Sequence, residues 1–307
     1  MATFCTLTPL LTLYFLLLLL MFQSATASPR KLILVQQQPL VLQYHNGPLL
    51  TGNFSLNLIW YGRFSPSQRS IVADFFRSLS PSSAGFAAPP TVATWWATTS
   101  LYGHGPAHLT LGSQILDESY SLGNQLTSSQ ITAMAGRAGR PRADSISVVI
   151  TSSDVAVEGF CSSRCGAHGP VAGSAGYVWV GDSSAQCPGQ CAWPFHQPIY
   201  GPQTPPLVAP NGDVGMDGVV INLATLLAGA VTNPNGRGYF QGPATAPLEA
   251  VTACTGMFGT GAYPGYPGKV LVDPSSGASY NARGMDGRKF LLPAMWNPKT
   301  SQCTTLV

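Results

Sequence analysis

Six cysteines in the C-terminal half of the chain constrain its fold more than any other sequence feature. They form two closely spaced pairs and two single positions: Cys161, Cys165, Cys187, Cys191, Cys254 and Cys303. Two such pairs could bind one zinc ion through four thiolates. We expect disulfides instead, because the number is even and the N-terminus indicates export to an oxidising compartment. The sequence leaves the pairing open.

The N-terminus has the pattern of a secretory signal. An apolar run over 7–22 is followed by the small residues Ala25-Thr26-Ala27, which is typical of cleavage after Ala27. No Lys or Arg precedes the run, and a retained membrane anchor is the alternative, but the run is short for a bilayer span of ~20 residues. We predict a signal peptide over 1–27, which removes Cys5, and a secreted protein that keeps no membrane segment.

Composition narrows the class of protein further. Only 9% of the residues are charged and the net charge is +3, whereas 45% are hydrophobic and the chain contains 33 Gly and 26 Pro. Soluble domains carry roughly 25% charged residues, and nucleic acids require a much denser Lys/Arg surface. We predict no nucleic-acid partner. The chain is too apolar to be disordered and too rich in Gly and Pro for a helical bundle, so we expect a globular, loop-rich protein. The length of 28–307 fits one domain or two, and we predict one because no linker or internal repeat is visible.

Three helices are indicated by capping residues and apolar periodicity. Ser65 and Thr127 each precede a helical pattern and have a Gln three residues on, as in a capping box. The third helix is predicted to begin after Asp217 as N-cap and to end at Asn233. Because it is apolar on nearly all sides, this helix should be buried. A further short helix is expected over 247–254.

Runs of apolar and β-branched residues predict the strands. A hairpin is expected across 45–48 and another across 274–277, where turn residues separate extended runs. The predicted strands lie at 31–35, 40–44, 56–62, 146–150, 177–180, 269–273 and 279–281. The expected fold class is therefore α+β, with a mixed, partly antiparallel sheet, helices packed on it and disulfide-stapled loops.

Residue spacings that would establish catalysis are missing from the sequence. The zinc motif H-E-x-x-H, the G-x-S-x-G elbow and the phosphate-binding loop do not occur. Asp154 and Glu158 follow a buried strand and, with His168, are candidates for acid–base catalysis, although capping and loop hydrogen bonds explain the acids equally well. His104 and His108 have a metal-pair separation, but the Gly and Pro around them argue against a helix. We assign no catalytic centre, metal or cofactor.

Aromatic residues in Gly- and Pro-rich loops are candidate ligand contacts. Trp193, Tyr200 and Tyr239 lie in such loops, where flat rings can stack on sugars and nearby amides can bind hydroxyls. The alternative is that these rings anchor long loops. Asn53-Phe54-Ser55 is an acceptor sequence for N-glycosylation at Asn53.

One long and unusual motif is Cys-Pro-Gly-Gln-Cys-Ala-Trp-Pro-Phe-His over 187–196. Further characteristic segments lie at 45–48, 58–62, 152–161, 247–249 and 303–307. In these motifs the chain resembles a plant family, the EXORDIUM or phosphate-induced proteins, and the likeness covers essentially all of 35–307.

This resemblance implies a secreted protein of the extracellular space, apoplast or cell wall that is linked to brassinosteroid-dependent growth and cell expansion. It supplies no catalytic residues. We therefore expect a non-catalytic binding or signalling factor whose partner is a cell-wall glycan or an extracellular protein. The alternative is an extracellular hydrolase, zincin-like or carboxylate-based, that acts on wall polysaccharide or peptide.

The order of the predicted elements also resembles the zincin metallopeptidases. On that likeness the third predicted helix stands where the zinc helix stands. Thr225, Leu226 and Gly229 then occupy the positions of the first His ligand, the general base and the third ligand. Thr is a poor zinc ligand, Leu cannot act as a base and Gly has no side chain. The likeness thus implies a degenerate zincin-like topology that has lost its zinc.

Overall fold

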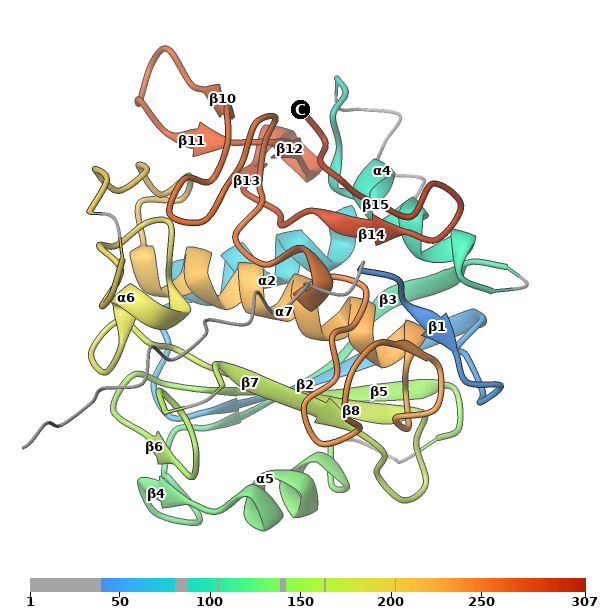
Figure 1. Ribbon diagram of the computed structural model, residues 1–307. Coiled ribbons are helices and arrows are strands. Elements are labelled where there is room, and N and C mark those ends of the chain that lie inside the picture. The colour runs from blue at the N-terminus through green and yellow to red at the C-terminus, as the bar shows by residue number, and fades with distance from the viewer. Residues whose placement is uncertain (1–39, 81–87, 104, 139–141, 163, 202) are drawn as a thin grey trace, which may run out of the picture. The chain divides into compact units, whose positions relative to one another are not determined.

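A five-stranded sheet organises the chain in the computed structural model (Figure 1). The structure describes residues 40–80, 88–103, 105–138, 142–162, 164–201 and 203–307. The strands of the sheet are β2 Gly52–Tyr61, β3 Ala107–Asp117, β5 Ser145–Thr151, β7 Gly166–Gly169 and β8 Gly176–Gly181. Their order is β3-β2-β5-β8-β7, all parallel except β7, which runs antiparallel to β8. Within the described residues, β3 and β7 are therefore the edges of a mixed sheet.

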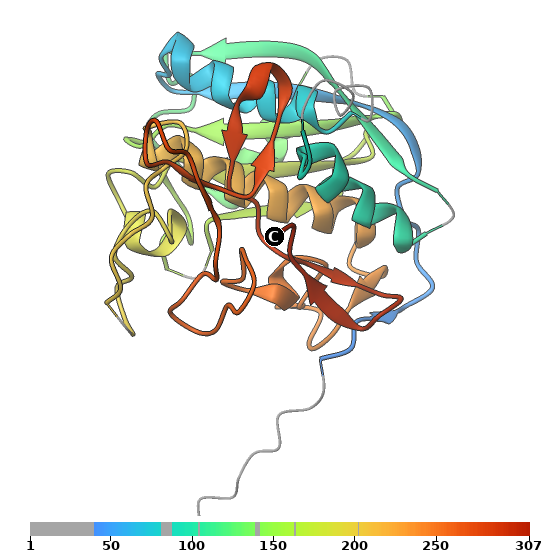
Figure 2. The same ribbon diagram turned by 90° about the horizontal axis from the view of Figure 1, so that it is seen from above.

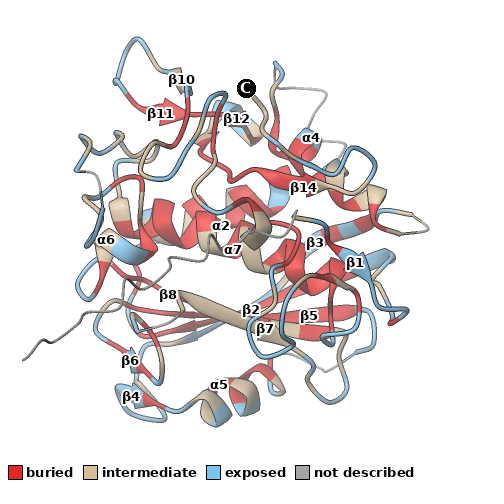
Figure 3. Ribbon diagram, viewed as in Figure 1, coloured by how far each residue is buried: buried red, intermediate tan, exposed pale blue. Residues whose placement is uncertain are grey.

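Helices cover both faces of this sheet (Figures 1 and 2). The α-helices are α2 Pro66–Ser78, α4 Val92–Ala97, α5 Ser128–Ala135, α6 Pro188–Cys191 and α7 Val214–Thr232; the 3-10 helices are η1 Thr98–Leu101, η2 Thr252–Cys254 and η3 Met285–Gly287. Helices α2 and α7 pack on one face and α5 on the other. Helix α7 is long and apolar enough to cross a membrane, but 78% of its most apolar 18-residue stretch is buried inside the protein. Figure 3 shows this burial along the helix. It is the central helix of the core.

Two-stranded pairs complete the fold. They are formed by β1 Gln43–Tyr44 with β9 Tyr239–Phe240, β4 Gln125–Leu126 with β6 Ala156–Val157, β10 Leu271–Val272 with β11 Ser279–Tyr280, β12 Ala282–Arg283 with β13 Lys289–Phe290, and β14 Met295–Asn297 with β15 Gln302–Thr304. The β4–β6 pair is parallel and the others are antiparallel. The C-terminal pairs lie on the side of α7 that faces away from the sheet (Figure 1).

Side-chain alternation along β2 explains why both faces of the sheet are covered. Leu56, Leu58 and Trp60 belong to the core under α2 and α7, whereas Ile59 and Tyr61 belong to the core under α5. Successive residues of a strand point to opposite faces. A strand segment that is apolar at successive positions, as 58–61 of β2 is, therefore needs cover on both sides.

The capping predictions are confirmed for two helices. Ser65 accepts a hydrogen bond from the backbone of Gln68, whose side chain accepts from Ser65 in return. Thr127 and Gln130 form the same capping box at α5. These are local interactions between residues three apart, and for that reason the sequence alone predicts them.

The predicted N-cap of α7 is wrong. Asp213, not Asp217, accepts from the backbone of Met216 and caps the helix. Asp217 lies buried in the first turn, where it accepts hydrogen bonds from the backbone and side-chain amides of Asn211 at 2.8 and 2.6 Å. Both aspartates are good capping residues, and tertiary contacts decide between them.

The expected hairpin across 45–48 is also wrong. Strand β1 pairs with β9, which lies far along the chain, and not with the segment that follows 45–48. The helix expected over 247–254 is confined to η2, and the long edge strand β3 has no counterpart among the predicted strands. The hairpin across 274–277 is confirmed by the β10–β11 pair. The predicted strand at 31–35 and the signal peptide over 1–27 lie outside the described residues.

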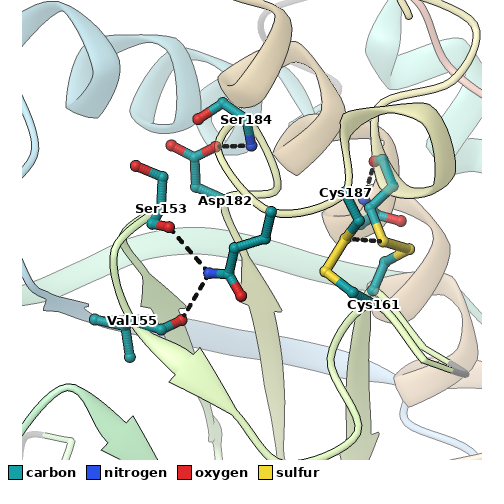
Figure 4. Close-up of a disulfide and its surroundings, with 10 residues drawn as sticks. Ser153, Val155, Cys161, Asp182, Ser184 and Cys187 are labelled. Atoms are coloured by element: carbon teal, nitrogen blue, oxygen red, sulfur yellow. Dashed lines mark hydrogen bonds between the residues drawn. A yellow bond between two sulfur atoms is a disulfide. The ribbon is translucent and has the colours of Figure 1, made fainter. Parts of the chain in front are cut away.

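All six cysteines form disulfides, which confirms the prediction. The bonds are Cys161–Cys187, Cys165–Cys191 and Cys254–Cys303. The first two tie the segment around 161–165 to α6. Beside them, the amide of Gln186 donates to the backbone carbonyls of Ser153 and Val155 at 2.9 and 3.0 Å (Figure 4). The loop that follows β8 is thereby held against the carboxyl end of β5.

We predict unequal costs for removing these bonds. No other disulfide of the described chain closes the loop between Cys254 and Cys303, which are 49 residues apart. Changing both cysteines to Ala should therefore lower the free energy of unfolding by about 3–4 kcal/mol. Removing Cys165–Cys191 alone should cost much less, because Cys161–Cys187 still closes nearly the same loop of 26 residues. Denaturant unfolding of the two double variants gives the comparison, and equal losses would contradict it.

The buried Asp217 should make stability depend on pH. Burial raises the pKa of its carboxyl from 3.8 to about 7. The folded protein then binds this proton more tightly than the unfolded chain. The free energy of unfolding should therefore fall as pH rises between these two values, by at most ~1.4 kcal/mol per pH unit.

Thermal or denaturant unfolding between pH 4 and pH 7 measures this effect. Asp217→Asn should flatten the decline, while the exposed Asp144→Asn should leave it unchanged. Burial also raises the pKa of Asp182, so a smaller decline should remain in the Asp217 variant. A slope identical in all three proteins would refute the assignment.

Candidate functional site

A cavity of about 740 Å³ lies against the edge of the sheet. Every residue of β7 lines it, together with Leu226 of α7. Two loops, 233–236 and 244–247, and the side chain of Glu249 complete the wall. The cavity thus collects residues that are distant in the sequence and is created by packing α7 and its following loops beside β7.

Three polar side chains meet at this cavity. Nε2 of His168 is 2.8 Å from Oε2 of Glu249, and Nδ2 of Asn233 donates to Oε1 of the same carboxylate at 2.7 Å. The side chains of His168 and Glu249 are only 11% and 10% exposed. Both oxygens of Glu249 therefore have a partner, and we call these residues the His168–Glu249–Asn233 cluster.

The second ring nitrogen of His168 differs from the first. Among the described residues, Nδ1 has no hydrogen-bond partner although it is buried. Because Glu249 is an acceptor, Nε2 carries a proton that it donates to the carboxylate. In the neutral ring, Nδ1 is then an unused acceptor. Buried polar atoms without a partner are rare and call for an explanation such as a ligand or a bound water.

Local structure explains how each member of the cluster is placed. His168 pairs with Val178 in the sheet. Asn233 is the C-cap of α7, and its Oδ1 accepts from the backbone of Gly238 at 2.7 Å. Glu249 is fixed through its backbone N–H, which donates to Thr252 at 2.7 Å. Three separate elements therefore each supply one member.

Two glycines make the close approach of α7 and β7 possible. A Cβ at Gly229 would lie 2.6 Å from Nε2 of His168 and 2.8 Å from Oε2 of Glu249. On the strand, a Cβ at Gly166 would lie 2.6 Å from Cδ1 of Leu226. Side chains at either position would displace the cluster or the helix, so the absence of a Cβ is the property that matters here.

The acids proposed from sequence have other partners. Asp154 accepts from Ser152 and Tyr120 at 2.6 and 2.7 Å, and these hydrogen bonds lower the pKa of its carboxyl. Glu158 accepts from the backbone of Ser128 at the start of α5, which lowers its pKa in the same way. The third candidate, His168, is paired with Glu249 rather than with either acid.

The two histidines considered as a metal pair give no site in the described structure. His108 is exposed on β3, and His104 lies outside the described residues. Across the described ranges, no group of three His, Cys, Asp or Glu side chains is placed to hold a metal ion.

The candidate aromatic contacts occupy separate environments. Trp193 packs on Phe258 with ring centroids 5.8 Å apart and borders another cavity of about 200 Å³. Tyr239 is held between Tyr44 and Tyr102, with centroids 4.9 and 5.0 Å away. Tyr200 is 88% exposed.

The remaining sequence candidate is the glycosylation acceptor. Asn53 is exposed near the start of β2. Its position leaves the acceptor amide outside the core, and glycosylation there stays a prediction.

The sequence pattern indicates His168 as a candidate but gives no indication that Glu249 and Asn233 are its partners. The histidine and the glutamate are 81 residues apart, and no spacing rule relates them. The available signal was the segment 247–249, which belongs to the motifs shared with a known family.

Comparison with known proteins now identifies that family. The model of the phosphate-induced protein 1 conserved region matches residues 42–306. The chain belongs to the EXORDIUM family. It is 59% identical to Protein EXORDIUM-like 2 of Arabidopsis thaliana over 292 residues, which cover 92% of this chain and 95% of the relative.

Two further relatives extend this result. Protein PHOSPHATE-INDUCED 1 of Nicotiana tabacum is 55% identical, with 95% of this chain and 97% of the relative covered. Protein EXORDIUM of Arabidopsis thaliana is 56% identical, with 87% and 90% covered. The family resemblance inferred from the sequence motifs is confirmed.

The likeness to zincin metallopeptidases is not supported. No solved structure matches the chain. In α7, the hydroxyl of Thr225 donates to the carbonyl of Ile221, Leu226 lines the cavity and Gly229 faces the cluster. None of the three provides a metal ligand or a base. The α+β class with a mixed sheet and stapled loops is confirmed without that finer assignment.

We predict that Gly229→Ala destabilises the protein by about 1–3 kcal/mol, because the new Cβ overlaps the His168–Glu249 pair. The cost should shrink in a His168→Ala background, where one of the two opposing side chains is gone. A double-mutant cycle measured by denaturant unfolding tests the coupling. Additive losses would show that Gly229 does not serve to accommodate the pair.

Proposed function

We propose that this EXORDIUM-family protein is a secreted, non-catalytic binding protein of the plant apoplast or cell wall that acts in growth regulation. The cavity at β7 is its ligand site. The observation that carries this proposal is the His168–Glu249–Asn233 cluster, which places hydrogen-bonded polar side chains on the wall of the cavity.

The chemistry of the lining supports binding over catalysis. Glu249 has both oxygens occupied by Asn233 and His168, so it serves to orient the ring. The described lining offers no Ser or Cys as nucleophile, and its one hydroxyl belongs to Thr245. Small ligand sites combine apolar walls with a few fixed polar groups, and this cavity has that composition.

The disulfides support the proposed location. All six cysteines of the described chain are oxidised, and bonds of this kind persist in oxidising compartments outside the cytosol. The apolar N-terminal segment with small residues at its end supplies the matching export signal.

A hydrolase acting on wall polysaccharide or peptide is the second candidate, and the same cluster favours it. A carboxylate that holds the Nε2 proton of a histidine leaves Nδ1 as the basic nitrogen; because Nδ1 of His168 is buried, the ring would have to turn toward the cavity before it could take a proton from water. In that reading, His168 is the base and Glu249 positions it.

We predict that the soluble fluid of the plant apoplast raises the unfolding temperature of the purified protein, since a ligand that binds only the folded state stabilises it. Ala246→Trp fills the cavity from its exposed wall and should abolish the rise. Ala97→Trp is the matched control at an exposed alanine outside the cavity lining and should retain it.

Mass spectrometry of the same fluid distinguishes the two functions. A binding protein leaves its composition unchanged after incubation. New fragments that fail to appear with Glu249→Gln would establish the hydrolase instead. A temperature rise equal in wild type and Ala246→Trp, or absent in both, would remove the cavity from consideration as the ligand site.

A further inference from the structure

We propose that the ligand of this cavity is an extended peptide, which binds as an additional strand on the free edge of β7. The inference rests on the proposed role of the cavity as the ligand site. It names the chemical class of the ligand and the part of the protein that recognises it.

The edge of the sheet supplies the main recognition element. In the described structure β7 has β8 on one side and no strand on the other. An edge strand presents a row of backbone N–H and C=O groups to which another chain can pair. Its four residues span roughly 13 Å, at about 3.3 Å each, which is enough to pair with a short segment.

The cavity follows this edge along its whole length. All of 166–169 and the adjoining Pro170 line it. The facing wall is formed by the loops 233–236 and 244–247. A chain laid beside β7 would therefore enter a preformed site between the strand and these loops, rather than lie on an open surface.

Side-chain directions on β7 leave space for the added strand. Ala167 packs on the α5 side of the sheet, so its neighbours Gly166 and His168 face α7. Gly166 presents no side chain there, and Leu226 supplies an apolar surface next to it. His168 is the one polar side chain of β7, and its Nε2 is already paired with Glu249, so the backbone of β7 is what this strand offers to the peptide.

The lining favours a peptide over a glycan. Sugar sites use aromatic rings as stacking platforms, and the described residues around this cavity include no Trp, Tyr or Phe. Its lining charges are those of Arg164, His168 and Glu249, and the only acid is already paired with the histidine. Backbone pairing is therefore the strongest recognition that the cavity can offer.

A library of capped octapeptides selected against the purified protein tests this inference. We expect selected peptides to bind wild type and Ala97→Trp alike, and to bind Ala246→Trp at least tenfold more weakly. Single N-methylations along one such peptide should weaken binding at alternate positions, by about fivefold each, since only every second N–H pairs with β7.

Each other outcome overturns the inference. Peptides that bind Ala246→Trp as well as wild type do not use the cavity. If N-methylation weakens binding at every position instead of at alternate positions, the peptide does not bind as an added strand. If no peptide is selected while apoplastic fluid still stabilises wild type but not Ala246→Trp, the cavity binds another class of ligand and only this inference fails. If the fluid has no such effect either, the proposed function fails as well.

Discussion

The burial of α7 is the constraint on which the rest of the structure depends. The helix is apolar on almost every side and packs against β7, β8 and α2. Each fully buried Val or Leu side chain contributes about 1.5–3 kcal/mol relative to exposure. One face of α7 rests on the sheet, and the other requires the C-terminal segment as cover. Within that segment, the backbone N–H of Ala294 donates to the carbonyl of Met257 and that of Trp296 to the carbonyl of Ala250, which joins two of its parts to each other.

Packing α7 so closely brings polar groups into the interior, where each must find a partner. Glu249 is one such group. One of its oxygens accepts from Asn233, the C-cap of α7, and the other pairs with His168 of β7. A single carboxylate thereby links the helix end, a loop and the sheet edge. The cavity lies where these three elements meet, and its polar character follows from the same contacts that anchor the loops.

Interactions between near neighbours were predictable. The capping boxes at Ser65 and Thr127 and the apolar runs of β2, β5 and β8 follow from residue types a few positions apart. The pairing of β1 with β9 was not, because short strands carry no mark of a distant partner. The long strand β3 was missed for a related reason. It lies at the edge of the sheet and the C-terminal half of the strand is mostly exposed, so its pattern of apolar residues is weak.

The sequence by itself determined the family, the α+β class, the capping boxes at Ser65 and Thr127 and the use of six cysteines as cross-links, because each follows from local patterns or from composition. Only the tertiary structure decided which cysteines join, which aspartate caps α7 and which acid stands beside His168. Those choices depend on contacts between residues that are remote in the chain. Their distances are set by the packing of the helices on the sheet and not by spacing along the sequence.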